Sequence, residues 1–178
     1  MDNADRLLDE MLLLRYQTGD DLAFEQIVRR YHGPLLYFVR RMIAPGDGAD
    51  DVLQQVWMAA YQQLPRLRHT DALRVWLYRT ARNLAIRGLR RKPREMPVES
   101  LDQVPDEPEA EFGPEDAAAV HAALIRLSAE HREVLVLRFM EQMSYEEIAD
   151  TVGRDLGTIR SRLYYGKRAL RRELEQTL

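Results

Sequence analysis

The chain has 178 residues and a formal net charge of −3 at pH 7, which is the size of one ordinary domain or two small ones. It contains no cysteine, so disulfides, thiolate metal sites and a cysteine nucleophile are excluded. Hydrophobic residues make up 46% and charged residues 31%, with 9 Gly and 8 Pro, which excludes a fibrous or disordered protein and predicts a helix-rich globular chain, most simply two small domains.

Residues 1–20 begin with acidic side chains and contain no apolar run long enough for a signal peptide or a membrane span, so we expect a cytoplasmic protein with no membrane insertion. From residue 7 onward, apolar side chains recur at steps of three and four residues, which predicts helices with core-facing stripes. We expect breaks at Gly19-Asp20 and Gly33-Pro34. The stripe residues are Leu7, Leu8, Met11, Leu12, Leu14, Phe24, Ile27, Val28, Tyr31, Leu35, Leu36, Phe38 and Val39.

Residues 47–64 predict a further helix with one apolar and one polar face. The polar face is ordinarily just solvated, unless a partner binds there. The apolar positions are Val52, Leu53, Val56, Trp57, Ala60 and Tyr61, and the polar ones are Asp50, Asp51, Gln54, Gln55 and Gln62.

Residues 74–94 are strongly basic and contain no acid. The basic residues are Arg74, Arg79, Arg82, Arg87, Arg90, Arg91, Lys92 and Arg94, and they are interleaved with Trp76, Tyr78 and Asn83. Basic side chains neutralise phosphates and aromatic rings stack on unpaired bases, which favours nucleic-acid binding. A helix that merely ends in basic residues, which suit its C-terminus, is the other interpretation.

Residues 95–116 contain nine acidic residues and no Lys or Arg, so the rest of the chain is net basic. The stretch also holds Pro97, Pro105, Pro108 and Pro114 and has no apolar periodicity, which is typical of a solvated linker. A surface loop inside one domain is the alternative, although structureless loops of this length are uncommon in compact domains.

The C-terminal part predicts helices over residues 117–127 and 129–140, followed by two helices joined by a turn. Ser144 and Glu147 form a capping-box pattern that marks the start of the third helix. That helix is expected to end at Gly153. A basic helix resumes near Leu156. Two short helices of this kind, with the second basic, are typical of a helix-turn-helix, whose second helix fits the DNA major groove. An ordinary helical hairpin with a wet face is the alternative.

The apolar stripe of the last helix determines which side chains face outward. With Ile159, Leu163, Gly166 and Leu170 on the buried side, Thr158, Ser161, Arg162 and Tyr165 are expected to face away, flanked by Arg160, Tyr164 and Arg168. Arginine pairs with guanine edges in the major groove, and Ser or Thr bonds to bases or phosphate. This face is therefore a candidate for duplex DNA recognition.

Two parts of the chain resemble the sigma-70 family of bacterial RNA polymerase sigma factors, in particular its short extracytoplasmic-function class. Region 4 of that family is similar to SAEHREVLVLRFMEQMSYEEIADTVGRDLGTIRSRLYYGKRALRREL, residues 128–174. Region 2 is similar to ADDVLQQVWMAAYQQL, residues 49–64, followed by RVWLYRTARNLAIRGLRR, residues 74–91. The two resemblances occur in the family's order and cover nearly the whole chain apart from the linker.

In such proteins region 2.2 docks on the coiled coil of the largest polymerase subunit. The resemblance therefore implies core polymerase-binding residues Asp50, Asp51, Gln54 and Gln55. Gln55 stands where the family often has an acid, which allows a hydrogen bond there in place of an ion pair.

WLYRTARN is similar to regions 2.3 to 2.4, which implies that Asn83 lies at the family's pocket for a flipped, unpaired base of the minus-10 element. The implied minus-10 contacts are Leu67, Arg74, Trp76, Arg79, Arg82, Asn83 and Arg87, of which Arg79 and Arg82 suit a structural role equally well. Leu67 replaces a phenylalanine found in many relatives, so an aliphatic contact would replace stacking.

In region 4, the family's minus-35 reading positions match Arg160, Ser161, Arg162, Tyr164 and Tyr165, and Thr158 and Arg168 belong to the same face. Asp155 replaces a proline common in the turn. An acid there would repel phosphate if it pointed outward, so we expect it to cap the recognition helix instead.

Together these patterns predict an all-α protein of two small helical domains: a region 2 domain at 1–94, a flexible acidic linker at 95–116 and a region 4 domain at 117–178. The resemblance implies an initiation factor that binds core RNA polymerase and promoter DNA, with an anti-sigma factor as a further partner and no metal or small-molecule cofactor. The alternatives are a stand-alone helix-turn-helix regulator and a helical adaptor that binds only proteins. No catalytic residue is predicted, because His32, His69, His121 and His131 form no ligand or nucleophile motif.

Overall fold

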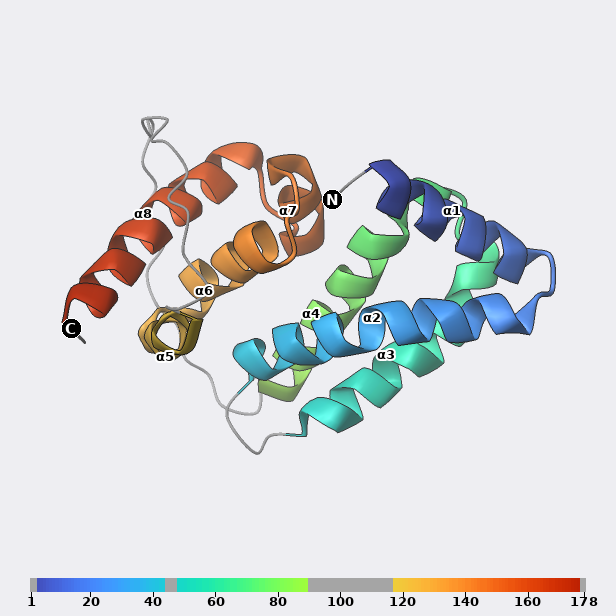
Figure 1. Ribbon diagram of the computed structural model, residues 1–178, viewed down its shortest axis with the longest axis horizontal. Helices are drawn as coiled ribbons and strands as arrows, with labels where there is room; N and C mark the ends of the chain where they lie inside the picture. Colours follow the sequence, from blue (N-terminus) through green and yellow to red (C-terminus); the bar gives the residue numbers. More distant parts are fainter. Residues whose placement is uncertain (1–2, 44–47, 90–116, 177–178) are drawn as a thin grey trace. The chain divides into compact units, whose positions relative to one another are not determined.

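The computed structural model describes residues 3–43, 48–89 and 117–176, so the predicted linker lies outside the described residues. Within them all regular structure is helical, which confirms the all-α prediction (Figure 1). The helices form two compact units, an N-terminal one built from α1 to α4 and a C-terminal one built from α5, α6, most of α7, and α8.

The N-terminal unit packs four helices against one another. They are α1 (Asn3–Gln17), α2 (Asp21–Met42), α3 (Ala49–Gln63) and α4 (Leu73–Leu89), with the short 3-10 turns η1 (Leu64–Arg66) and η2 (Thr70–Ala72) between α3 and α4. Helix α2 contacts α1, α3 and α4, and is therefore the centre of the unit. Its fully buried residues include Ile27, Leu35 and Phe38, and the Phe38 ring meets the buried Tyr78 ring of α4 edge-on at a centroid distance of 5.3 Å.

The predicted break at Gly33-Pro34 is wrong, because α2 runs continuously through both residues. Proline has no N–H and costs an internal helix one hydrogen bond. Buried residues on either side, Tyr31 before the pair and Leu35 after it, hold the helix against the core. Tertiary packing therefore overrides the local signal. The other predicted break is confirmed: α1 ends before Gly19, which has a φ of +98°, and Asp20 caps α2 by accepting the backbone N–H of Leu22 at 3.1 Å.

The predicted core face of α1 is also largely wrong. Leu7, Met11 and Leu14 are 46–57% exposed, whereas Leu12 and Leu13 are at most 2% exposed. Helix α1 carries leucines on all its sides, so the apolar pattern alone does not determine how the helix is rotated about its axis. Polar contacts do: the Tyr16 hydroxyl donates to the carbonyl of Tyr61 at 2.9 Å, and α1 turns the face carrying Tyr16 inward.

The C-terminal unit is built from α5 (Ala117–Arg126), α6 (Ala129–Leu135) with its π-helical extension η4 (Val136–Met140), most of α7 (Tyr145–Val152), and α8 (Leu156–Glu175). The predicted capping box begins α7: the N–H of Glu147 donates to the Ser144 hydroxyl at 3.1 Å, and the Ser144 N–H donates to the Glu147 carboxylate at 2.8 Å. Helix α7 ends at Gly153, whose φ of +68° lies in the left-handed region that glycine adopts without strain.

The turn after Gly153 leads directly into α8, whose N-cap is Asp155. The Asp155 carboxylate accepts the backbone N–H and the hydroxyl of Thr158, both at 2.8 Å. The predicted cap is thus confirmed, and so is the helix-turn-helix formed by α7 and α8. The core of the unit includes Val134, Leu137 and Ile148, together with the predicted α8 stripe of Ile159, Leu163, Gly166 and Leu170.

Candidate nucleic-acid and protein interfaces

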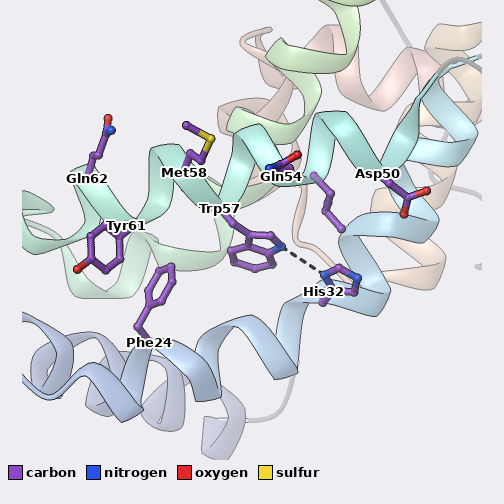
Figure 2. Close-up of a pocket in the computed structure, with 9 residues that line it drawn as sticks. Phe24, His32, Asp50, Gln54, Trp57, Met58, Tyr61 and Gln62 are labelled. Carbon is purple, nitrogen blue, oxygen red and sulfur yellow. Dashed lines mark hydrogen bonds between the residues drawn. The ribbon is translucent and has the colours of Figure 1, made fainter.

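An open pocket of about 510 Å³ lies between α2 and α3 in the N-terminal unit (Figure 2). Phe24 and His32 of α2 form one wall of it. The other wall comes from α3 and consists of Asp50, Leu53, Gln54, Trp57, Met58, Tyr61 and Gln62. Two of the four predicted polymerase-binding residues, Asp50 and Gln54, therefore line the pocket, while Asp51 and Gln55 are exposed on α3 outside its lining.

Aromatic contacts shape this pocket. The Trp57 indole N–H donates to His32 Nδ1 at 3.3 Å, and the two rings stack with centroids 6.4 Å apart. The Phe24 ring stands edge-on to Trp57 and to Tyr61, at centroid distances of 6.5 and 5.5 Å. These contacts fix the indole before any partner binds, so the apolar floor of the pocket is preorganised.

The apolar pattern of residues 47–64 predicted Tyr61 on the core face of this helix, and that prediction is wrong. Tyr61 is 57% exposed and Met58 58% exposed, and Trp57 is only partly buried. Large rings that are apolar but carry a polar end are common at the centre of protein interfaces. One signal in the sequence could have indicated this exposed site. Met58 and Tyr61 form an apolar pair three residues apart, on the face of α3 that also carries the amides of Gln54 and Gln62.

Helix α4 presents a basic face to solvent. Arg79, Asn83 and Arg87 are exposed and follow one another at steps of four residues, so they lie in one row along the helix. Trp76 and Arg82 are partly exposed beside this row. Five of the predicted minus-10 residues are therefore accessible on the same helix. The basic residues at 90–94 lie outside the described residues.

The loop that carries Leu67 is held by a residue that the sequence analysis did not single out. Gln17, the last residue of α1, donates its side-chain amide to the carbonyls of Leu64 and Leu67 at 3.0 and 2.8 Å. Leu67 itself is partly exposed, between η1 and η2. The loop leading into α4 is thus tied to α1, and only the position of Gln17 at the end of a helix hinted at such a role.

Arg74, a predicted DNA contact, is buried, and that placement is a correction. It is 7% exposed and lies near a buried acid of α1, Asp9, which is 4% exposed. Asp9 accepts a hydrogen bond from the Tyr31 hydroxyl and pairs with Arg30 Nε at 2.9 Å. Burial raises the pKa of both Asp9 and Tyr31, while the positive charges of Arg30 and Arg74 act to lower both pKa values. Because a buried carboxylate needs cationic partners, Arg74 belongs to the interior of the unit.

The outward side of α8 carries most, not all, of the predicted minus-35 residues. Arg160 and Arg168 are exposed, and Tyr164 and Tyr165 are partly exposed, with their rings edge-on at 5.2 Å. The Arg168 guanidinium carbon lies 5.7 Å from the centroid of the Tyr164 ring, a cation–π contact that restrains both side chains. Thr158 is partly exposed, and its hydroxyl is occupied by Asp155.

Ser161 and Arg162 were also expected to face outward, and the structure buries both, at 9% and 8% exposure. The Ser161 hydroxyl turns back onto its own helix and donates to the carbonyl of Thr158 at 3.0 Å. Arg162 pairs with Glu130 of α6 at 2.9 Å. Arg162 lies three residues after Ile159 and four before Gly166, and therefore at the edge of the buried stripe. The stripe is wider than the sequence pattern predicted.

Charge at the start of α8 is controlled by the cap. The backbone N–H and the hydroxyl of Thr158 both donate to the Asp155 carboxylate and lower its pKa below the ordinary value. The acid is therefore ionised at neutral pH with its oxygens turned toward the helix N-terminus, where negative charge is favourable. Among the described residues no cluster of three His, Asp or Glu side chains is arranged to hold a metal ion, and no helix is long and apolar enough to cross a membrane.

Comparison with known proteins assigns both parts of the chain to known regions. The family description "Sigma-70 region 2" matches residues 27–95, and "Sigma-70, region 4" matches residues 117–170. The chain is 32% identical to the RNA polymerase sigma-H factor of Pseudomonas aeruginosa, over 96% of this chain and 95% of that protein. It is 31% identical to the ECF RNA polymerase sigma-E factor of Escherichia coli K12, over 94% of each.

Two solved structures have a similar fold. The sigma factor RpoE of Bartonella quintana, in complex with the anti-sigma factor NepR, is 28% identical, with a TM-score of 0.68 over 85% of this chain and 96% of that one. CnrH, in complex with the cytosolic domain of CnrY, is 24% identical, with a TM-score of 0.71 over 96% of this chain and 99% of that one.

Proposed function

The chain belongs to the sigma-70 family of RNA polymerase sigma factors, in its extracytoplasmic-function class, and from this premise we propose which of its surfaces bind polymerase and DNA. As a sigma factor it is a transcription initiation factor that binds core polymerase and directs it to promoters. We assign polymerase binding and minus-10 recognition to residues 1–94, a linker to 95–116 and minus-35 recognition to 117–178. We further propose that the chain catalyses no reaction itself and acts in the cytoplasm.

The pocket between α2 and α3 is the proposed polymerase-binding surface. Asp50 and Gln54 supply polar contacts at its edge, and Trp57, Met58 and Tyr61 supply exposed apolar area. An apolar centre with a polar rim is the usual composition of a protein interface. The Asp50 carboxylate also lies 3.9 Å from Arg40, but both groups are well exposed, so this ion pair is weak and leaves Asp50 available to a partner.

The exposed row on α4 is the proposed site for the melted minus-10 strand. Arg79 and Arg87 carry positive charge for the phosphates, and Asn83 between them offers both donor and acceptor groups to the edge of an unpaired base. Trp76 gives a ring on which a base stacks, and Leu67 adds an aliphatic contact at the tip of the loop. Because melted bases are unpaired, such a site captures them without competing with the complementary strand.

The outward face of α8 is the proposed reader of the minus-35 duplex. Its exposed Arg160 and Arg168, with Tyr164 and Tyr165 between them, match the size and charge of a recognition helix in the major groove. The observation that carries the proposal is the presence of two basic faces on two units, Arg79 to Arg87 on α4 and Arg160 to Arg168 on α8, each without an acid between its exposed arginines.

An anti-sigma factor is the proposed regulatory partner. The Bartonella quintana sigma factor, 28% identical to this chain, was solved in complex with such a protein. The exposed apolar groups of the N-terminal unit give a regulator area to bind, and a regulator that covered the pocket between α2 and α3 would compete directly with polymerase.

Abortive transcription tests these assignments. Core polymerase with the wild-type chain is expected to start specific transcripts on genomic fragments from the source organism. Asn83→Ala and Arg160→Ala are each expected to reduce them, whereas the control Arg29→Ala, an arginine with an 81% exposed side chain on α2, leaves them unchanged. If the chain instead binds duplex DNA tightly without polymerase and never supports initiation, a stand-alone regulator replaces this proposal.

A further inference from the structure

The contact between α8 and α6 includes a charged side chain that points inward. Arg162 of α8 keeps only 9% of its side chain exposed and places Nη2 2.9 Å from Oε1 of Glu130, the second residue of α6. The Glu130 side chain remains 47% exposed. The guanidinium is thus removed from solvent on the side of the helix opposite to Arg160, and its charge is balanced by an acid from another helix.

The ion pair lies next to a close approach of the same two helices at Gly166. A Cβ atom at Gly166, one turn after Arg162, would lie 3.3 Å from Leu135 and 3.4 Å from the Cβ of His131, both in α6. His131 directly follows Glu130. The two contacts therefore form one continuous line along α6 and α8, with the ion pair at one end and backbone packing at the other.

Neighbouring charges favour this pairing. Burial lowers the pKa of the His131 imidazole and the charge of Arg162 lowers it further, while Glu130 acts in the opposite direction. The imidazole is accordingly neutral at pH 7, and Arg162 is the cation that balances Glu130 at this contact. A buried arginine is tolerated only with such a partner, because a guanidinium without one loses its hydration and gains nothing in return.

We propose that Arg162 is a positioning residue for minus-35 recognition: through Glu130 it fixes the rotation of α8 on α6 and so aims Arg160, Tyr164 and Arg168 at the DNA groove. The inference rests on the proposed role of α8. It assigns to Arg162 a structural link in place of the DNA contact that its position in the sequence suggests. Hydrogen bonds to base edges need placement within a fraction of an ångström, so a small rotation of the helix weakens all of them together.

Glu130 makes the inference testable, because two explanations predict opposite signs for its replacement. If Glu130 acts only as a negative charge near DNA, Glu130→Gln removes a repulsion and strengthens promoter binding. If it positions α8, the same change weakens binding. Glu175→Gln is the matched control, since Glu175 is an exposed acid at the end of α8 and carries the same charge.

The experiment measures binding of holoenzyme, made from core polymerase and the full chain, to a promoter fragment selected from random DNA by the wild-type holoenzyme. Affinity is followed against salt for Arg160→Ala, Arg162→Gln, Glu130→Gln, Glu175→Gln and the double variant Arg162→Gln/Glu130→Gln. We expect Arg162→Gln and Glu130→Gln each to weaken binding by about 3- to 10-fold, and the double variant to do no worse than either. The slope of log K against log salt stays at its wild-type value for all three. Hydrogen exchange of the α8 amides, measured without DNA, should be faster in each single variant than in wild type. In the double variant it should be no faster than in either single variant.

Several results would overturn the inference while the proposed function stands. One is a salt slope that falls by about 0.9 for Arg162→Gln alone, the signature of a lost phosphate contact. A second is tighter or unchanged binding by Glu130→Gln. A third is coupled exchange of the α8 amides without any effect on promoter affinity. If Arg160→Ala also binds as tightly as wild type, then α8 does not read the promoter, and the proposed function fails together with the inference.

Discussion

Gly166 offers the most direct test of how tightly the recognition helix packs, because two opposing effects act on Gly166→Ala. Alanine favours a helix interior over glycine by about 1 kcal/mol. Against this, the added methyl group would lie 3.3 Å from Cγ and Cδ1 of Leu135, tighter than an ordinary van der Waals contact, so Leu135 must shift by a few tenths of an ångström. Leu135 is 2% exposed and packed within the core, so we expect overpacking of about 1–3 kcal/mol. We expect a net loss of about 1 kcal/mol in the C-terminal unit.

Gly33→Ala in α2 is the matched control. A Cβ atom there meets nothing within 4 Å beyond its own chain neighbours, and the residue is exposed within a continuous helix, so overpacking does not act. The helical preference of alanine favours the change, and the ring of Pro34, which disfavours a helical residue with a Cβ atom before it, opposes it, so we expect the stability of the N-terminal unit to change by less than about 0.5 kcal/mol. Native-state hydrogen exchange measures both effects, through amides of α8 and of α2. Slower exchange in α8 after Gly166→Ala would refute the packing argument, since it would mean that α6 yields to the new methyl group.

Three further predictions concern the turn between η4 and α7, the N-cap of α8, and the pocket between α2 and α3. Gln142 has a φ of +53°, so Gln142→Gly is expected to stabilise the C-terminal unit by about 0.5–1 kcal/mol in denaturant unfolding, and a loss of stability would contradict the backbone argument. The lowered pKa of Asp155 means that its stabilisation of α8 is complete above the ordinary carboxyl pKa and is lost as pH falls through the folded value. Protection of α8 amides should therefore decline in that acidic window in wild type and stay flat in Asp155→Asn. Trp57→Ala is expected to weaken core polymerase binding at least 10-fold in a fluorescence titration, while Leu14→Ala, at an exposed apolar site on α1 outside the pocket, has little effect.

The sequence predicted the C-terminal unit better than the N-terminal one, for reasons that lie in particular residues. Ser144 with Glu147, Gly153 and Asp155 are local signals, because each acts within four residues of itself, and the structure confirms them. Gly33-Pro34 is also a local signal, but the packing around it extends over several turns and prevails. Local patterns predict the start of a helix where the backbone would otherwise be exposed to solvent. They fail where packing against the core outweighs them.

The rotation of a helix was harder to predict than its existence. On α1 the exposed Leu7 and the buried Leu13 belong to the same apolar run, and only contacts with distant residues separate them. On α3 an apolar side chain such as Tyr61 stays exposed because it belongs to a pocket and not to the core. Hydrophobicity alone does not distinguish a surface kept apolar for a partner from one buried in folding, since the same chemistry serves both.

Residue type also fails to predict the burial of two arginines. Arg74 on α4 and Arg162 on α8 both belong to basic helices, and both are buried near an acid from a different helix, Asp9 for one and Glu130 for the other. An arginine side chain is buried only when a carboxylate meets it, so each of these residues permits one rotation of its helix and penalises the others. That rotation exposes Arg79 on α4 and Arg160 on α8. A charged residue inside the protein therefore helps to determine which charged residues of the same helix remain outside.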